Sequence, residues 1–256
     1  MDRFTERINT IIADREHGSS TLVQWIIDAL ADRGPDTPSL AQRRWALEAL
    51  RTIDHSMVVV HHLLDTLGTE PGDDFQARLD DYIHRWSDIP TRVARQLLSL
   101  GDWKGARVLL HSHSGMLLSA IEQVHQAEPT IRFCQTRSLP GGEGTTQHRF
   151  LQDRGIACEL VNDGDVARLA PSLYAAWLGV DQYDDRCFVN KVGSRRIAKA
   201  LLAAGKPVYV LGDSRKRVRQ VAYSGELFEA VPFAEGLHLV TEDGVQPTVS
   251  GAHNFS

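Results

Sequence analysis

The stretch that decides the fold runs from Trp177 to Lys199 and reads WLGVDQYDDRCFVNKVGSRRIAK. It opens with a short apolar run that ends at a single carboxylate, Asp181. A polar turn and the VNKVGS run at 189–194 follow, and apolar residues at intervals of three and four then predict an amphipathic helix from about residue 195. A strand, a polar loop and a helix in this order place polar side chains at the carboxyl edge of a parallel sheet, where open α/β folds bind ligands.

Three side chains in this stretch suit a small-molecule site. Asp181 can take or give a proton, Lys191 supplies positive charge, and Asn190 can both donate and accept hydrogen bonds. The helix start at Gly193–Ser194 offers free backbone N–H groups to an anion. A purely structural interpretation fits the same spacing, with a turn-capping aspartate, a solvated lysine and a glycine needed only for the turn. Spacing alone leaves both interpretations open.

The longer segment 177–216 resembles the signature of a known family. Its landmarks are Gly179-Val180-Asp181, VNKVGS at 189–194, GKPVYV at 205–210 and DSRK at 213–216. In order and spacing they resemble the G-A-D, V-N-K-I-G-T, G-K-P-x-Y-V and E-T-x-K segments of the family that holds the alpha, beta and delta subunits of translation initiation factor 2B. That family also contains two sugar-phosphate isomerases, for methylthioribose-1-phosphate and for ribose-1,5-bisphosphate. The resemblance extends from about residue 14 to about residue 247, so it implies the family's fold for most of the chain.

Size and composition are those of an ordinary globular protein. The chain has 256 residues, 42% hydrophobic and 24% charged, and a net charge of −5. This charge gives no electrostatic reason to expect DNA as a partner. No apolar run approaches the roughly 20 residues that cross a bilayer, so we expect no membrane association. The three cysteines lack metal-ligand spacing, and the charged start of the chain lacks a secretion signal. We therefore expect a reduced, cytoplasmic protein. We expect neither a metal nor a cofactor.

The periodicity divides the chain near residue 100. Residues 1–100 predict an all-helical N-terminal lobe, with breaks at 34–38 and 68–74. From residue 101 to residue 256, short β-branched and aliphatic runs alternate with helical segments. The expected strands are 106–110, 131–134, 155–161, 175–180, 207–211 and 237–241. This alternation predicts an α/β fold with a Rossmann-like, doubly wound sheet.

A first loop that could carry chemistry is HSHSG at 111–115. Two histidines without a third ligand make a poor metal site, and a serine nucleophile would lack the G-x-S-x-G elbow. We expect His111 and Ser112 to form hydrogen bonds at the mouth of a pocket. In the isomerases the matching loop resembles T-H-C-N-A-G, which places Ser112 where their catalytic cysteine stands. A hydroxyl is a far weaker acid than a thiol with a pKa of ~8.5, and H-S-x-S is closer to the initiation-factor subunits.

A second loop, 136–146, combines three glycines and two threonines with Arg137 before a helix. Its backbone N–H groups and the guanidinium could bind a phosphate. A mobile loop with a surface arginine would have the same sequence pattern. The loop resembles the family's E-[ST]-R-P-x-x-x-G segment, whose arginine contacts substrate phosphate in the enzymes. The resemblance therefore assigns Arg137 and Gly142 to substrate binding, while Gln135 and Ser138 depart from the pattern.

A third loop, His17 to Ser20, stands at a helix start in the first lobe. The isomerases carry R-G-A there, with the arginine near the substrate, so the resemblance implies that Gly18 and Ser19 contact the ligand. His17 replaces the arginine, which weakens phosphate binding unless the imidazole is protonated.

Two functions fit these residues, with a pocket between lobe and sheet expected in either case. In the first, the protein is an aldose–ketose isomerase in which Asp181 moves the proton and Asn190, Lys191 and Arg137 hold hydroxyls and phosphate. In the second, it is a non-catalytic subunit that binds a sugar phosphate or nucleotide and a protein partner. The first hypothesis rests on Asp181 and the Asn190–Lys191 pair; Ser112 and His17 favour the second. A homodimer or larger homo-oligomer is expected by resemblance.

Overall fold

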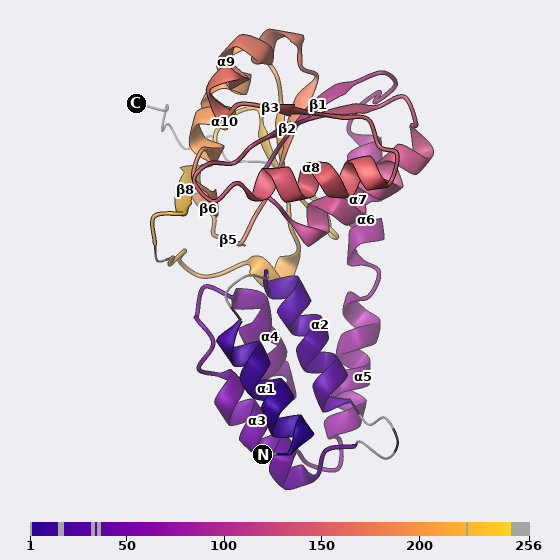
Figure 1. Ribbon diagram of the computed structural model, residues 1–256, viewed down its shortest axis with the longest axis vertical. Helices are drawn as coiled ribbons and strands as arrows, with labels where there is room; N and C mark the ends of the chain where they lie inside the picture. The colour runs from indigo at the N-terminus through magenta and orange to yellow at the C-terminus, as the bar shows by residue number, and fades with distance from the viewer. Residues whose placement is uncertain (1, 15–17, 32–33, 35–36, 224, 247–256) are drawn as a thin grey trace. The chain divides into compact units, whose positions relative to one another are not determined.

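The structure is a computed structural model that describes residues 2–14, 18–31, 34, 37–223 and 225–246. The chain divides into two compact units, Met1–Asp88 and Ile89–Ser256 (Figure 1). The sequence pattern changes near residue 100, whereas helix α6 (Ile89–Ser99) belongs to the second unit by its packing.

The first unit is helical, as its apolar periodicity predicts. Its helices are α1 (Arg3–Ala13), α2 (Ser19–Leu30), α3 (Leu40–Leu50), α4 (Val58–Leu67) and α5 (Phe75–Trp86). Local signals fix several helix starts: Asp2 accepts a hydrogen bond from the Thr5 amide, and Ser39 forms a reciprocal capping box with Gln42.

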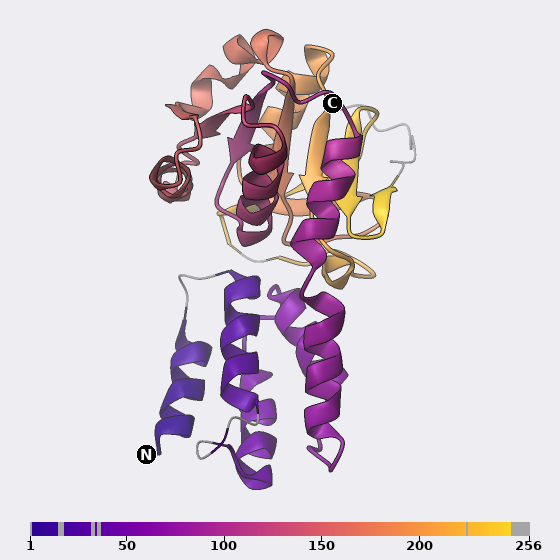
Figure 2. The same cartoon turned by 90° about the vertical axis from the view of Figure 1, so that its right-hand side faces the viewer.

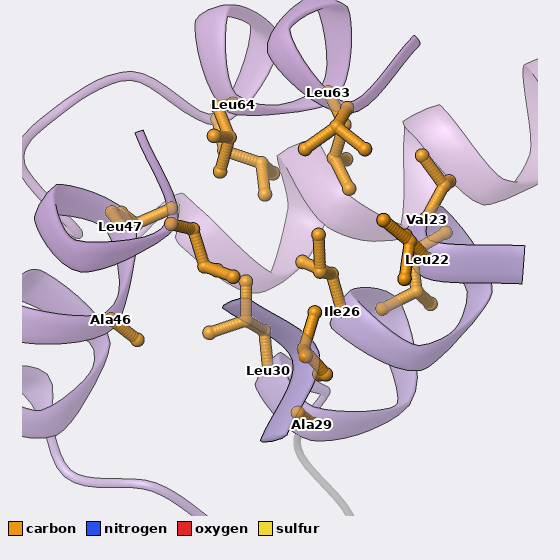
Figure 3. Close-up of a cluster of buried hydrophobic side chains, with 14 of the residues drawn as sticks. Leu22, Val23, Ile26, Ala29, Leu30, Ala46, Leu47, Leu63 and Leu64 are labelled. Atoms are coloured by element: carbon orange, nitrogen blue, oxygen red, sulfur yellow. The ribbon is translucent and has the colours of Figure 1, made fainter. Parts of the chain in front are cut away.

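The core of the first unit is built from the apolar faces of these helices. Side chains of α2, α3 and α4 point toward one another around Ile26 and Leu30, both fully buried (Figure 3). Burying side chains of this size contributes about 1.5–3 kcal/mol each to the free energy of folding. The labelled members of the cluster are Leu22, Val23, Ile26, Ala29, Leu30, Ala46, Leu47, Leu63 and Leu64.

The second unit is organised around a seven-stranded sheet with the strand order β10-β9-β7-β4-β1-β2-β3. All neighbouring strands are parallel except β10, which pairs antiparallel with β9. The central strand β4 is buried throughout, as expected for a strand covered on both faces. The strands are β1 (Arg107–His111), β2 (Arg132–Thr136), β3 (Cys158–Val161), β4 (Ala175–Gly179), β7 (Val208–Leu211), β9 (Leu237–Thr241) and β10 (Gly244–Gln246).

Helices cover both faces of this sheet. Helix α6 packs against α7 (Gly115–Ala127) and β9, and Figure 2 shows α6 and α7 side by side on one face. Helices α9 (Val166–Leu169) and α10 (Ser194–Ala203) lie on the other face (Figure 1). Helix α8 (Glu143–Asp153) packs against β2 and β3. The predicted fold, a helical N-terminal lobe followed by a Rossmann-like doubly wound sheet, is confirmed.

The direction of winding reverses at the centre of the sheet. The chain runs from β1 outward to β2 and β3, returns to β4 on the other side of β1, and then runs outward to β7 and β9. Open α/β sheets bind ligands beyond the carboxyl ends of their strands at such a reversal. The topology therefore predicts a ligand site at the ends of β1 and β4, where His111 is the last residue of β1, Ser112 follows it, and Val180–Asp181 follows β4.

A second, three-stranded sheet was not predicted. It has the order β5-β6-β8 and is antiparallel, with β5 (Gln182–Tyr183), β6 (Cys187–Lys191) and β8 (Phe228–Pro232). The expectation of a polar loop between Asp181 and the helix is therefore wrong for residues 187–191. Strand β6 forms because its partner β8 comes from a distant part of the chain, which local pattern does not reveal.

Among the described helices, none has the length and apolar content that crossing a bilayer requires.

Candidate functional site

Most of the predicted site residues of the second unit gather at the carboxyl edge of the large sheet. His111 ends β1 and Ser112 follows it, Arg137 follows β2, and Asp181 follows β4. Asn190 and Lys191 reach the same edge as the last residues of β6. The side-chain contacts below show which of these groups actually meet.

Asp181 is bonded to the strand that carries Asn190. Gln182 lies opposite Val189 in the β5–β6 ladder, and the amide of the preceding residue, Asp181, donates to the Val189 carbonyl at 2.9 Å. This hydrogen bond joins the segment after β4 to β6, in which Asn190 is the next residue after Val189. Two residues predicted to act together therefore lie on neighbouring segments.

The Asp181 carboxyl group has an altered proton affinity. Burial raises its pKa above the ordinary value of 3.8, and the positive charge of Lys216 partly opposes the rise. Lys216 is itself buried and donates to the carbonyl of Val180, the residue before Asp181. A carboxyl group with a raised pKa at a ligand-binding edge is suited to both giving and accepting a proton.

His111 is fully engaged by the protein. Its Nε2 lies 3.0 Å from the Val192 carbonyl oxygen, which can only accept, so Nε2 carries the proton. Its Nδ1 lies 2.7 Å from the Thr136 hydroxyl and accepts from it in the neutral ring. Burial lowers the pKa of His111, which favours this neutral form. The imidazole thus connects the end of β1 to the last residue of β2 and to the residue after β6.

Ser112 and Ser138 adopt unusual backbone conformations. Their φ angles are 67° and 62°, in the left-handed region that non-glycine residues rarely occupy. The Ser112 amide donates to the Ser138 hydroxyl at 2.7 Å, and the Ser138 amide donates to the Asp163 carboxylate at 3.0 Å. Such conformations cost on the order of 1–2 kcal/mol and persist where surrounding bonds fix them. The Asp163 carboxylate thus helps to fix the backbone of the loop at Ser138.

Glu143, a residue to which the sequence assigned no role, meets two of the predicted residues. Its Oε1 lies 2.9 Å from the Lys191 ammonium and accepts from the Ser112 hydroxyl at 3.2 Å. Lys191 is buried, and Glu143 is partly exposed in the first turn of α8. The structure begins α8 at Glu143, within the predicted loop 136–146, and an acidic residue directly after Gly141–Gly142 is a signal for such a helix start, where the helix dipole favours negative charge.

Asn190 is buried and connects the site to α10. Its amide donates to the Ser194 hydroxyl at 2.9 Å, and that hydroxyl donates to the Lys191 carbonyl at 2.7 Å. The Asn190 Oδ1 lies 3.9 Å from the point that a Cβ atom on Gly179 would occupy. Asn190 therefore lies close to the end of β4.

The N–H groups expected to be free at the start of α10 already have an acceptor. The amides of Gly193 and Arg195 both donate to the Glu229 carboxylate, at 2.7 and 2.9 Å. The prediction of an open anion site at Gly193–Ser194 is wrong for these two groups, because β8 brings a carboxylate of the chain itself to this position.

Arg137 is exposed beside this cluster. Its Nε donates to the Asn162 side chain at 3.1 Å, and within the described residues its two terminal amino groups form no hydrogen bond. Gly142 has a φ of 76° and caps α8, and a Cβ atom there would meet nothing within 4 Å. The glycine therefore serves the backbone conformation of the loop.

Gly18 and Ser19 belong to the first unit, where Gly18 precedes α2 and Ser19 is its first residue. Their assignment to ligand binding remains a prediction, as does a pocket between the lobe and the sheet. His17 lies outside the described residues. In the part of the chain that the structure describes, no group of three or more His, Cys, Asp and Glu side chains is arranged to hold a metal ion.

Comparison with known proteins identifies relatives. A family model described as the Initiation factor 2 subunit family matches residues 70–249. The eIF-2B subunit 2-like translation initiation factor of Pyrococcus horikoshii is 25% identical over 174 residues, which are 66% of this chain and 62% of that protein. The corresponding protein of Pyrococcus abyssi is 23% identical over 224 residues, 84% of this chain and 79% of that protein.

Solved structures agree on the fold. The P. horikoshii translation initiation factor eIF-2B superposes with a TM-score of 0.79 at 22% identity, covering 96% of this chain and 97% of that one. The 5-methylthioribose 1-phosphate isomerase of the same organism gives a TM-score of 0.75 at 14% identity, covering 94% and 83%. The family predicted from residues 177–216 is confirmed: this chain belongs to the initiation factor 2 subunit family.

Proposed function

We propose that the chain binds a phosphorylated sugar at the carboxyl edge of the seven-stranded sheet and interconverts its aldose and ketose forms. The observation that carries the proposal is the position and pKa of Asp181. This carboxyl group follows the central strand β4, belongs to a residue whose amide is bonded to β6, the strand that carries Asn190, and has a pKa that burial raises.

The chemistry needs one group that moves a proton and others that hold the sugar. Conversion of an aldose into a ketose moves one hydrogen from C2 to C1 and one hydroxyl proton from O2 to O1, without an oxidant or reductant. Asp181 would accept the proton in its ionised form and return it in its protonated form. Asn190 and Lys191 would hold hydroxyl groups, and Arg137 would hold the phosphate through its terminal amino groups.

Removal of the Arg137 guanidinium should weaken phosphosugar binding. We expect Arg137→Met to raise the Kd for a pentose 5-phosphate about 10–100-fold, since a charge-assisted hydrogen bond contributes roughly 1.5–3 kcal/mol. Calorimetric titration measures the change. Arg132→Met is the matched control, because Arg132 is an exposed arginine at the opposite end of the same strand. Equal losses in both variants would exclude a specific role for Arg137.

A second candidate function is binding without turnover, as in a regulatory subunit that takes a sugar phosphate or nucleotide. Ser112 favours it, because its hydroxyl is a weak acid and already donates to Glu143. A thermal-shift screen against pentose and methylthiopentose phosphates, followed by NMR for aldose-to-ketose conversion, separates the two functions. Conversion by the wild type supports the isomerase. Ligand stabilisation without conversion, with turnover gained in Ser112→Cys, supports the second function.

We also propose that the protein is a homodimer or larger homo-oligomer in the cytoplasm. Its three cysteines are free thiols, which suits a reducing compartment. Strand β8 is an edge strand, and three large apolar side chains around its start are about 40% exposed: Tyr223, Leu227 and Phe228.

Phe228→Glu should shift this assembly toward the monomer, because it introduces charge into the exposed apolar patch. Light scattering on an eluting sample measures the mass, and Leu40→Glu, an exposed leucine of the first unit, is the control. A wild-type protein that elutes as a monomer would exclude the assembly.

A further inference from the structure

Glu143 occupies the position that an anionic ligand group would take next to Lys191. One carboxylate oxygen, Oε1, accepts from both the Lys191 ammonium and the Ser112 hydroxyl, at 2.9 and 3.2 Å. A lysine ammonium and a serine hydroxyl on one oxygen are the kind of contacts that hold a bound phosphate or carboxylate. The chain itself supplies this anion.

The pair is enclosed on the side of the glycine loop. The Lys191 side chain is only 4% exposed and that of Glu143 is 29% exposed. A Cβ atom built on Gly141 would lie 2.6 Å from Glu143 Oε2 and 2.9 Å from Lys191 Nζ. The backbone of the loop therefore closes over this side of the ion pair.

The charges of Lys191 and Glu143 determine which ligand groups can bind next to them. A buried ammonium needs a counter-anion, and Glu143 provides it, so Lys191 and Glu143 together carry no net charge. A phosphate brought to Lys191 would have to displace Glu143 or share one cation with it, and two like charges at close range in a poorly hydrated place repel strongly. A neutral hydroxyl can approach Lys191 without displacing Glu143 and without repulsion between like charges.

We propose that Glu143 is a specificity-determining residue that restricts the site to ligands with one phosphate. The exposed Arg137 binds the single phosphate. Lys191, paired with Glu143, binds an uncharged hydroxyl of the sugar and excludes a second phosphate. The substrate class named here rests on the proposed function; the electrostatic exclusion at Lys191 does not depend on it.

The test compares wild type with Glu143→Gln, which keeps the size of the side chain and removes its charge. Titration of a pentose 5-phosphate and a pentose 1,5-bisphosphate should show tighter binding of the bisphosphate by Glu143→Gln, by 10-fold or more. The affinity of the same variant for the monophosphate is the reference, and the ratio of bisphosphate to monophosphate affinity should rise about 10-fold or more. Glu122→Gln is the matched control, because Glu122 pairs with Arg154 on the partly exposed side of α7. Circular dichroism confirms that each variant is folded.

A second measurement uses inorganic phosphate and does not require the sugar. In an Arg137→Met background, Glu143→Gln should bind inorganic phosphate at least 10-fold more tightly than the parent, and adding Lys191→Met should abolish the gain. Unchanged or weaker binding after Glu143→Gln would overturn the inference, whatever the monophosphate does. If no sugar phosphate binds while the gain for inorganic phosphate is seen, the proposed function fails and the exclusion at Lys191 stands.

Discussion

Asp181→Asn is expected to lower the rate of aldose–ketose conversion by roughly 10²–10⁴-fold, the contribution typical of a positioned acid–base group. Asparagine has nearly the shape of aspartate but cannot carry the proton. Because Arg137, Asn190 and Lys191 stay in place, the Kd for a pentose phosphate should change only a few-fold. NMR of the sugar resonances measures conversion, and calorimetry measures binding.

The same substitution should change the pH dependence of stability. The raised pKa means that folded Asp181 holds its proton more tightly than the unfolded chain does. This group therefore stabilises the fold below the unfolded pKa, and that contribution is lost as the pH rises through the higher folded pKa. Asp181→Asn has no such loss, so its stability relative to wild type should be greatest near pH 7.5 and smallest near pH 4, as measured by urea unfolding.

Asp185→Asn is the matched control for both measurements. Asp185 lies in the turn between β5 and β6, but it is exposed and pairs with Arg217 at the surface. We expect near-normal conversion and little change in unfolding, since exposed ion pairs contribute about 0–1 kcal/mol. If Asp181→Asn retained most of the wild-type rate, Asp181 would not be the proton carrier.

Gly144→Ala is expected to disrupt the loop that carries the site. A Cβ atom on Gly144 would lie 2.0 Å from the Thr136 backbone oxygen and 2.7 Å from the Ser138 hydroxyl. The Thr136 oxygen belongs to the backbone of β2 and cannot rotate away as a side chain can. The start of α8 would therefore have to shift away from β2, and such overpacking costs about 3 kcal/mol or more. Chemical unfolding should show this loss. Glu143, Ser138 and Ser112 should be displaced together, so ligand binding should also fall.

Gly142→Ala provides the comparison within the same loop. A Cβ atom there meets nothing within 4 Å, so only its φ of 76° is unfavourable. The expected cost is about 1–2 kcal/mol, and binding should survive. Equal losses in the two variants would mean that the contact with Thr136 does not govern the loop.

The sequence predicts six of the seven strands of the main sheet because each of these six is marked locally, whereas the short edge strand β10 was not predicted. Runs such as VLL in β1 and AAWL in β4 are short, apolar and followed by helical periodicity, which is typical of parallel strands buried on both faces. Strand β6 lacks such a mark, since it ends in Asn190 and Lys191 and exists through its pairing with β8. Pairing between distant segments cannot be read from a local pattern.

The site was predicted in part for the same reason. Asp181, Asn190 and Lys191 could be grouped because they belong to one continuous stretch. Glu143 and Glu229 could not be predicted as part of this group, because each contacts a partner that is distant in the sequence. Glu143 pairs with Lys191, and Glu229 accepts hydrogen bonds at the start of α10. Both residues place the chain's own negative charge where sequence reasoning anticipated a ligand anion.

The pairing of β6 with β8 also bears on when the site is completed during synthesis. Most of its side chains have left the ribosome once Lys191 emerges, but the ladder that holds Asn190 and Lys191 needs Phe228–Pro232 as well. Domains fold as units while the chain is made, and contacts between distant segments form late. A nascent chain that stops before β8 would thus carry the Asp181 carboxylate and lack the support of its neighbours, so the candidate site is completed only after Phe228–Pro232 has been translated.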